Sequence, residues 1–110
     1  DRTHPLCYGY AHPRLPVFQG DTIFVEIANN PYATPVVFGA NPLLAGYLHE
    51  RHRKLVSGAA AVVVSGTGNG RVICFSGSPN FRGFWYGTNR MFANAVFFGG
   101  VIGGGAVERR

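Results

Sequence analysis

The segment between residues 66 and 99 constrains the fold of this chain more than any other part of it. Residues 59–64 form an unbroken apolar run, residues 65–70 are rich in glycine, and residues 71–75 are again apolar and β-branched. Two such runs joined by a short glycine-containing loop are typical of a β-hairpin. Because neither run alternates with polar residues, we expect both faces of these strands to be covered, in a central position of a layered sheet.

After the hairpin, the apolar residues take up a helical period. The spacing predicts a helix over roughly residues 86–98, which covers the sheet with one face. Thr88 is expected to cap its start, and the glycines at 99 and 100 to end it. The residues of the predicted buried face fall at i, i+4, i+7, i+8, i+11 and i+14: Phe84, Thr88, Met91, Phe92, Ala95 and Phe98.

The rest of the chain gives shorter signals. Prolines in the first twenty residues predict irregular structure outside the core. Residues 22–28 and 34–38 are each expected to form a short strand, and the two could pair as a hairpin. Residues 49–55 are polar enough for a surface turn or a single helical turn.

These elements predict one domain over residues 1–99 and a flexible glycine-rich tail over residues 100–110. The expected fold is α/β or α+β, with a mixed sheet of about four or five strands covered by the C-terminal helix. No initiator Met begins the chain, which indicates a piece of a longer protein. No apolar stretch approaches the roughly twenty residues of a membrane span, so no membrane contact is expected.

The balance of apolar and charged residues bears on partners. Aromatic residues and charged residues each make up 14% of the chain, so polar cover is scarce and we expect apolar surface to contact another domain or a second copy. The formal net charge is +5, with one basic cluster at residues 51–54. That cluster could attract an anionic partner, although a solvated basic stretch is the favoured interpretation.

The histidines and cysteines are the first candidates for a metal-binding or catalytic site. His49 and His52 are three residues apart rather than a full helical turn, and basic neighbours would repel a cation, which argues against a metal site. Cys7 near His4 lacks the glycine-flanked turn of a nucleophile elbow, so packing is favoured over catalysis. Cys7 and Cys74 could form one disulfide or remain two buried thiols, and the second alternative is favoured.

Two further motifs remain. The glycines at 66, 68 and 70 precede a strand rather than a helix, which favours a hairpin turn over a phosphate loop. The basic and aromatic run at residues 82–86 could stack nucleobases, but it leads into the helix and is expected to pack in the core. Arg82 is not explained by packing, and we expect its guanidinium to contact a carboxylate, another anion or backbone carbonyls as a structural clamp.

Three strings carry a family resemblance: residues 68–73, residues 79–83, and residues 87–98 around Gly87-Thr88 and Asn94-Ala95-Val96-Phe97-Phe98. They resemble the end of the glutamine-amidotransferase-like domain that follows the catalytic domain in bacterial zinc carboxypeptidases, of the carboxypeptidase A superfamily. Shorter upstream pieces extend the likeness over most of residues 3–99. The resemblance implies that this chain is part of a class I glutamine-amidotransferase-like layered domain.

The resemblance also implies a function for the parent protein. That parent would be a secreted, extracellular or periplasmic zinc hydrolase that removes C-terminal residues from peptides, with zinc held in its catalytic domain. None of the four histidines of this chain is followed three residues later by Glu, so no His-x-x-Glu zinc motif is present. The chain itself is therefore expected to be a non-catalytic accessory segment without a cofactor, in contact with the catalytic domain or with a second copy.

One alternative from another functional class stays open. Arg82, Trp85 and the basic stretch at residues 51–54 could form a nucleic-acid or polyanion-binding module. Nucleic acid is the less favoured partner, because the aromatic residues lead into an apolar helical stripe. A thiol enzyme that uses Cys7 and His4 is a third, weaker alternative.

Overall fold

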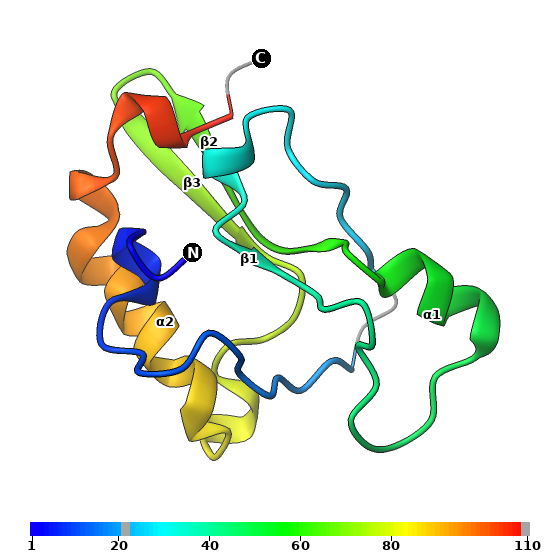
Figure 1. The fold of residues 1–110 in the computed structure, drawn as a ribbon. Helices are drawn as coiled ribbons and strands as arrows, with labels where there is room; N and C mark the ends of the chain where they lie inside the picture. The colour runs from blue at the N-terminus through cyan, green and yellow to red at the C-terminus, as the bar shows by residue number, and fades with distance from the viewer. Residues whose placement is uncertain (21–22, 109–110) are drawn as a thin grey trace.

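The computed structural model, which describes residues 1–20 and 23–108, is a single α+β domain (Figure 1). Three strands form one antiparallel sheet in the order β1–β2–β3: β1 (Val36–Val37), β2 (Ala60–Thr67) and β3 (Gly70–Phe75). The α-helices are α1 (Glu50–Val56) and α2 (Tyr86–Phe98). Among the described residues the sheet thus has three strands, rather than the four or five that the sequence predicts, and its strand pairings are antiparallel.

Short 3-10 turns complete the fold. They are η1 (Pro5–Cys7), η2 (Pro31–Ala33), η3 (Phe81–Gly83), η4 (Gly99–Val101) and η5 (Gly104–Ala106). Two of them, η1 and η2, begin with a proline, which is tolerated in the first turn because its missing N–H has no intrahelical partner there.

The predicted hairpin is present, and its turn is tighter than expected. β2 continues through Thr67, which pairs with Gly70, so only Gly68 and Asn69 form the connection. Gly68 has a φ of 56°, a backbone conformation that glycine adopts without a Cβ clash. The first glycine of the run, Gly66, therefore belongs to the strand and pairs with Arg71.

The two faces of the sheet differ in burial. On the inner face, Ala60, Val62 and Val64 of β2 are buried. On β3, Val72 is 49% exposed and Cys74 is exposed. The expectation that both faces of the hairpin are covered is therefore wrong for β3, because this strand lies at the edge of the sheet. The favoured interpretation of two buried thiols is also wrong, since both cysteines are free but only Cys7 is buried.

The core joins residues from both ends of the chain. Its buried members are Leu6, Val62, Val64, Met91, Ile102 and Val107. Leu6 is fully buried, which corrects the expectation that the first twenty residues lie outside the core. The C-terminal segment also differs from the predicted flexible tail, because Glu108 forms a parallel bridge with Ser65 of β2 and the preceding Val107 is buried.

Helix α2 has the bounds that its period predicts, and its buried face agrees with the predicted one in part, at Thr88, Met91 and the half-buried Ala95. The predicted cap Thr88 lies inside the helix, where its hydroxyl donates a hydrogen bond to the carbonyl of Pro79, and Trp85 precedes the first turn. Thr88, Met91 and Asn94 are buried, whereas Phe92 is 42% exposed. The difference lies at Phe92 and Phe98, which were expected in the core and are not buried, and at Asn94, which is buried with its amide directed to the carbonyls of Leu6 and Tyr8.

The two predicted strands before residue 39 do not pair with each other among the described residues. The first falls partly on residue 22, which lies outside them, and its remaining part makes one antiparallel bridge between Val25 and Ala60. The second is shortened to β1, which pairs with β2. The turn η2 lies between the two segments. Each of them pairs with β2 near Ala60, and they do not form a hairpin together.

Residues 39–58, here called the α1 arm, lie apart from the core. The single turn expected there is a short helix, α1, whose start is capped by His49 through Nδ1, 3.2 Å from the amide of Arg51. Val56 is the one residue of the arm that is buried. Figure 1 shows the helix at the side of the molecule away from α2.

Candidate functional site

Arg82, the residue singled out from the sequence, lies on the surface at a turn of unusual backbone conformation. Its φ is 50°, in the left-handed region that a non-glycine residue rarely occupies. Its guanidinium lies 5.2 Å from the centre of the Phe81 ring, a cation–π contact. Over residues 1–20 and 23–108 no carboxylate or carbonyl contacts it, so an anion contact at Arg82 stays a prediction.

The aromatic residues near Arg82 form one surface cluster. Phe81 stacks on Phe18 with ring centres 3.9 Å apart, and Trp85 lies edge-on to Phe84 at 6.4 Å. The indole of Trp85 donates a hydrogen bond to the carbonyl of Pro16 at 3.4 Å. These contacts tie the start of α2 to the N-terminal segment. The expectation that the run at residues 82–86 packs in the core is wrong, because Phe84 is 53% exposed, Tyr86 is 76% exposed and Trp85 is only half-buried.

A larger apolar surface lies along the outward side of α2. Its residues, here called the α2 outer face, are Tyr86, Phe92, Val96 and Phe97, whereas Phe98 at the helix end lies edge-on to Tyr8 with ring centres 5.6 Å apart. Phe97 is 80% exposed and Val96 is 66% exposed. The scarcity of polar residues predicts such a surface, but the helical period assigned two aromatic residues of the helix, Phe92 and Phe98, to the core.

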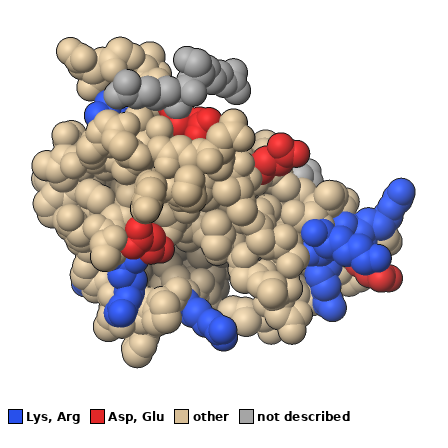
Figure 2. Space-filling view, turned by 45° about the horizontal axis from the view of Figure 1, so that its top comes forward, with Lys and Arg blue, Asp and Glu red and all other residues tan. Residues whose placement is uncertain are grey.

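The basic cluster predicted at residues 51–54 is displayed on the α1 arm. Arg51, Arg53 and Lys54 are all exposed, and Lys54 pairs with Glu50 at 3.7 Å. Figure 2 shows basic side chains gathered on the side of the molecule where Figure 1 places α1. The turn that carries Arg82 lies elsewhere in Figure 1, so the two parts of the predicted polyanion surface are not adjacent.

The N-terminal segment and α2 are joined by polar contacts, here called the N-terminal junction. The Asn94 amide donates to the carbonyl of Leu6 at 3.0 Å and to that of Tyr8 at 2.9 Å. The Tyr10 hydroxyl donates to the Gly87 carbonyl at 2.7 Å and accepts from the amide of Met91 at 3.1 Å. Sequence reasoning missed this role of Asn94, although a polar residue inside an apolar helical stripe was an available signal.

His4 and Cys7 are buried in the same region. Nδ1 of His4 accepts a hydrogen bond from the amide of Leu6 at 3.2 Å, while Nε2 is buried without a partner in the described part of the chain. Burial lowers the pKa of His4 and raises the pKa of the Cys7 thiol. Both shifts favour the neutral forms, so this pair lacks the thiolate that a cysteine nucleophile requires.

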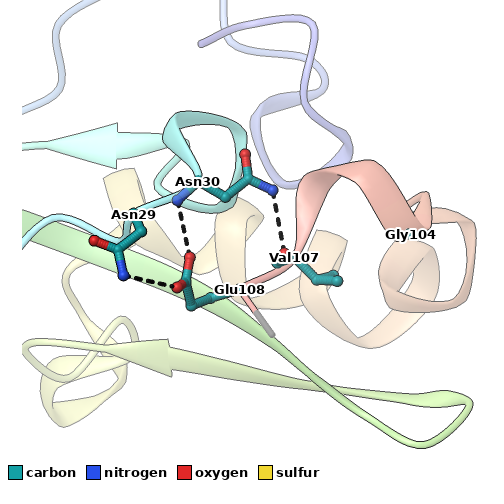
Figure 3. Close-up of a pocket in the computed structure, with 5 residues that line it drawn as sticks. All are labelled: Asn29, Asn30, Gly104, Val107 and Glu108. Atoms are coloured by element: carbon teal, nitrogen blue, oxygen red, sulfur yellow. Dashed lines mark hydrogen bonds between the residues drawn. The ribbon is translucent and has the colours of Figure 1, made fainter. Parts of the chain in front are cut away.

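A shallow hollow lies where the C-terminal segment meets η2 (Figure 3). The Glu108 carboxylate accepts from the amide of Asn30 at 2.9 Å and from the side chain of Asn29 at 3.4 Å. The Asn30 side chain in turn donates to the carbonyls of Gly105 and Val107 at 2.8 and 3.1 Å. These contacts use the polar atoms of the hollow to attach the C-terminal segment, which indicates a structural role.

The histidine pair and the glycine motif singled out in the sequence lie in different parts of the fold. His49 and His52 have ring centres 6.0 Å apart on the α1 arm, and no group of three or more His, Cys, Asp or Glu that could hold a metal occurs in residues 1–20 and 23–108. Gly66, Gly68 and Gly70 belong to the hairpin, as predicted. No helix in the described part of the chain is both long and apolar enough to span a membrane.

Comparison with known proteins adds no relative. No family model, no curated protein and no solved structure matches the chain. The function is therefore argued from the surfaces and contacts above.

Proposed function

We propose that this chain is a non-catalytic accessory domain, which packs against the catalytic domain of a zinc carboxypeptidase-like protein. The observation that carries the proposal is the α2 outer face. A helix that already buries one side against its own domain normally keeps a polar opposite side. Here the opposite side carries Val96 and Phe97 at 66% and 80% exposure, which favours a second protein surface over it.

The open face of the sheet supports the same proposal. Val72 and Cys74 of β3 are exposed, on the sheet face opposite the core to which α2 contributes. A layered glutamine-amidotransferase-like domain has further elements on that side, and the sequence resemblance suggests that this chain is its C-terminal part. The parent would be secreted, and its zinc and peptide substrate would bind in the catalytic domain.

The reading frame that encodes residues upstream of Asp1 tests the identity of the parent. We expect it to encode a His-x-x-Glu pair and a later histidine, the ligand pattern of the carboxypeptidase family. A frame without this pattern contradicts the proposal. The isolated chain, incubated with zinc and a peptide with a free C-terminus, is expected to release no amino acid, and zinc-dependent release would also contradict it.

The docking surface is tested in the protein that contains both domains. Phe97→Ser should weaken the domain contact and lower the unfolding temperature of the parent, while the isolated chain keeps its stability because Phe97 is exposed there. Tyr47→Ser is a matched control, since Tyr47 is 87% exposed on the α1 arm. Equal effects of the two variants on the parent would contradict docking through α2.

A second candidate function is polyanion binding by the α1 arm. The observation that favours it is the projection of α1, with Arg51, Arg53 and Lys54 exposed and Glu50 as the one acidic residue of the helix. Such a cluster attracts anionic polymers through charge and requires no buried site.

A salt titration decides this candidate. Binding of a single-stranded oligonucleotide or a sulfated polysaccharide should weaken steeply with salt, and the slope should decrease in Arg51→Gln/Arg53→Gln. Arg82→Gln serves as the control, because Arg82 lies apart from α1 (Figure 1). Absence of binding at low salt, or an equal loss in the Arg82 variant, would exclude the α1 arm as the binding site.

A further inference from the structure

The outer edge of β3 presents backbone groups that have no hydrogen-bond partner in the described part of the chain. In an antiparallel pair, every second residue directs its N–H and C=O towards the neighbouring strand. Ser76 donates its amide to the carbonyl of Ala61 at 2.9 Å, which fixes this alternation along the hairpin. The backbone N–H and C=O groups of Val72 and Cys74 therefore point towards β2. Those of residues 71, 73 and 75 point to the opposite edge.

The outward groups of Arg71, Ile73 and Phe75 make no backbone hydrogen bond within residues 1–20 and 23–108. The other side of the sheet is different. There the edge of β2 is covered by β1, by the bridge from Val25 and by the bridge from Glu108. One edge of this small sheet is thus closed by three segments, and the other is open.

The open edge also lacks the residues that usually prevent strand pairing. Natural edge strands are commonly protected by charged side chains, by proline or by a covering segment. Residues 71–75 contain neither proline nor acid, and their one charged residue, Arg71, is turned away. Its guanidinium donates to the carbonyls of Ile102 and Gly70, at 3.1 and 2.9 Å.

We propose that β3 pairs in antiparallel orientation with β3 of a second copy of this chain, about a twofold axis at Ile73. Unpaired N–H and C=O groups at a strand edge select another extended strand as the occupant. Because residues 71 and 75 lie symmetrically around Ile73, the edge is complementary to itself in this register. Ile73 then faces the partner's Ile73, Arg71 faces the partner's Phe75, and each facing pair exchanges two backbone hydrogen bonds.

The side chains fit a second copy in the same register. Val72 lies opposite the partner's Cys74, so that two small apolar side chains meet on the open sheet face. The residue opposite Arg71 is the partner's Phe75 rather than a second Arg71, so the register brings no two cations into a facing pair in a chain of formal charge +5. No like charges are brought together along the strand.

The end of α2 adds apolar surface next to this edge. The side chain of Ile73 lies 3.7 Å from the position that a Cβ on Gly99 would occupy, so η4 packs directly beside β3. Val101 of η4 is 64% exposed and Phe98 is 39% exposed. A second copy added at the edge would cover part of this surface, which a short peptide could not do. The inference does not depend on the proposed accessory function.

A cysteine cross-link tests the register in the full chain. In Val72→Cys the introduced sulfur would face the partner's Cys74 in a non-hydrogen-bonded pair, where the Cα atoms lie about 4.5 Å apart and within disulfide range. Two Cys74 residues would lie diagonally, about 7–8 Å apart, beyond that range. We expect mild oxidation to give a covalent dimer of the variant, linked between positions 72 and 74, and little dimer of the unchanged chain.

Val37→Cys is the matched control for the cross-link. Val37 is 51% exposed, close to the 49% of Val72, but it lies on β1 at the other side of the sheet. It should give no dimer. A rapid Cys74–Cys74 link in the unchanged chain, or equal cross-linking of the two variants, would overturn pairing about Ile73.

A charge exchange tests the pairing without a covalent bond. Val72→Lys/Cys74→Lys would place two lysines opposite each other across the twofold axis, whereas Val72→Lys/Cys74→Glu would place opposite charges there. Sedimentation equilibrium should show dimerisation of the unchanged chain, weakening of about tenfold in the first variant and recovery in the second. A chain that stays monomeric up to near-millimolar concentration, or one that instead binds an extended peptide of unrelated sequence as a monomer, overturns the proposal.

Discussion

The N-terminal junction and the α1 arm show two different ways in which parts of this chain are attached. At the junction, residues separated by more than seventy positions are joined by hydrogen bonds, among them the buried one of the Asn94 amide and the more exposed one of the Tyr10 hydroxyl. The arm is held mainly by local bonds, including that of the Ser57 hydroxyl to the carbonyl of Ala40 at 3.1 Å. Its exposed helix contributes charge to the surface and little to the core. Long-range contacts and exposed basic charge are thus placed in different regions.

The largest expected difference between these regions is in leucine packing. Leu6→Ala removes a fully buried side chain at the junction and should lower the free energy of unfolding by about 2–5 kcal/mol. Leu55→Ala on the arm removes a side chain that is 62% exposed, and it should change that free energy by less than about 0.5 kcal/mol. Urea unfolding followed by far-UV circular dichroism measures both. Similar losses of unfolding free energy in the two variants would contradict the expectation that the junction is packed more firmly than the arm.

The next effect concerns a buried amide. Asn94→Ala leaves the carbonyls of Leu6 and Tyr8 without their donor and should lower the free energy of unfolding by about 1–3 kcal/mol. Asn41→Ala on the arm is the matched control, because Asn41 is exposed. Thermal melting of the two variants at equal concentration gives the comparison. An equal shift would mean that the amide contacts at α2 add nothing to stability.

A smaller effect should appear with pH at His4. Burial lowers the pKa of His4 in the folded chain, so the unfolded chain binds a proton more readily. Stability from this group is therefore fully present above the unfolded pKa of about 6.5 and is lost as the pH falls below it, by at most about 1.4 kcal/mol per pH unit. The pH dependence of urea unfolding measures this slope. His4→Asn should reduce the slope between pH 7 and pH 5, and an unchanged slope would exclude His4 as its source.

The smallest effect is expected at the ion pair on the arm. Lys54→Gln removes a contact to Glu50 between side chains that are 79% and 82% exposed. Such a pair contributes about 0.3–0.5 kcal/mol, so the loss of unfolding free energy should stay below about 0.5 kcal/mol. The same denaturation assay at low and high salt checks it. A loss above 1 kcal/mol would show that the arm is more firmly attached than its exposure suggests.

The sequence predicts the local elements of this fold well. The hairpin follows from two apolar runs around Gly68-Asn69, and the period of residues 86–98 gives the bounds of α2. In both cases the determining contacts lie between residues close in sequence, so local chemistry is sufficient. The strand at residues 34–38 was also recognised, although only Val36 and Val37 pair in the sheet.

Contacts between residues far apart in the sequence could not be predicted from these local patterns. The burial of Leu6 depends on α2 and the C-terminal segment, and nothing within the proline-rich N-terminal segment indicates it. The burial of Asn94 in α2 goes with hydrogen-bond partners that lie more than eighty residues away. For the candidate site, composition predicted an exposed apolar surface and residues 51–54 predicted the basic arm. The outward position of Phe97 and the open edge of β3 required the structure.

The makeup of the core has a consequence for synthesis on the ribosome. The hairpin needs only neighbouring residues and can form as soon as Phe75 has emerged. The core, by contrast, requires Leu6 from the beginning of the chain together with Ile102 and Val107. Until these last residues leave the exit tunnel, the apolar inner face of the hairpin lacks its final cover. A nascent chain stalled before Val107 would therefore be a preferred substrate for a ribosome-associated chaperone.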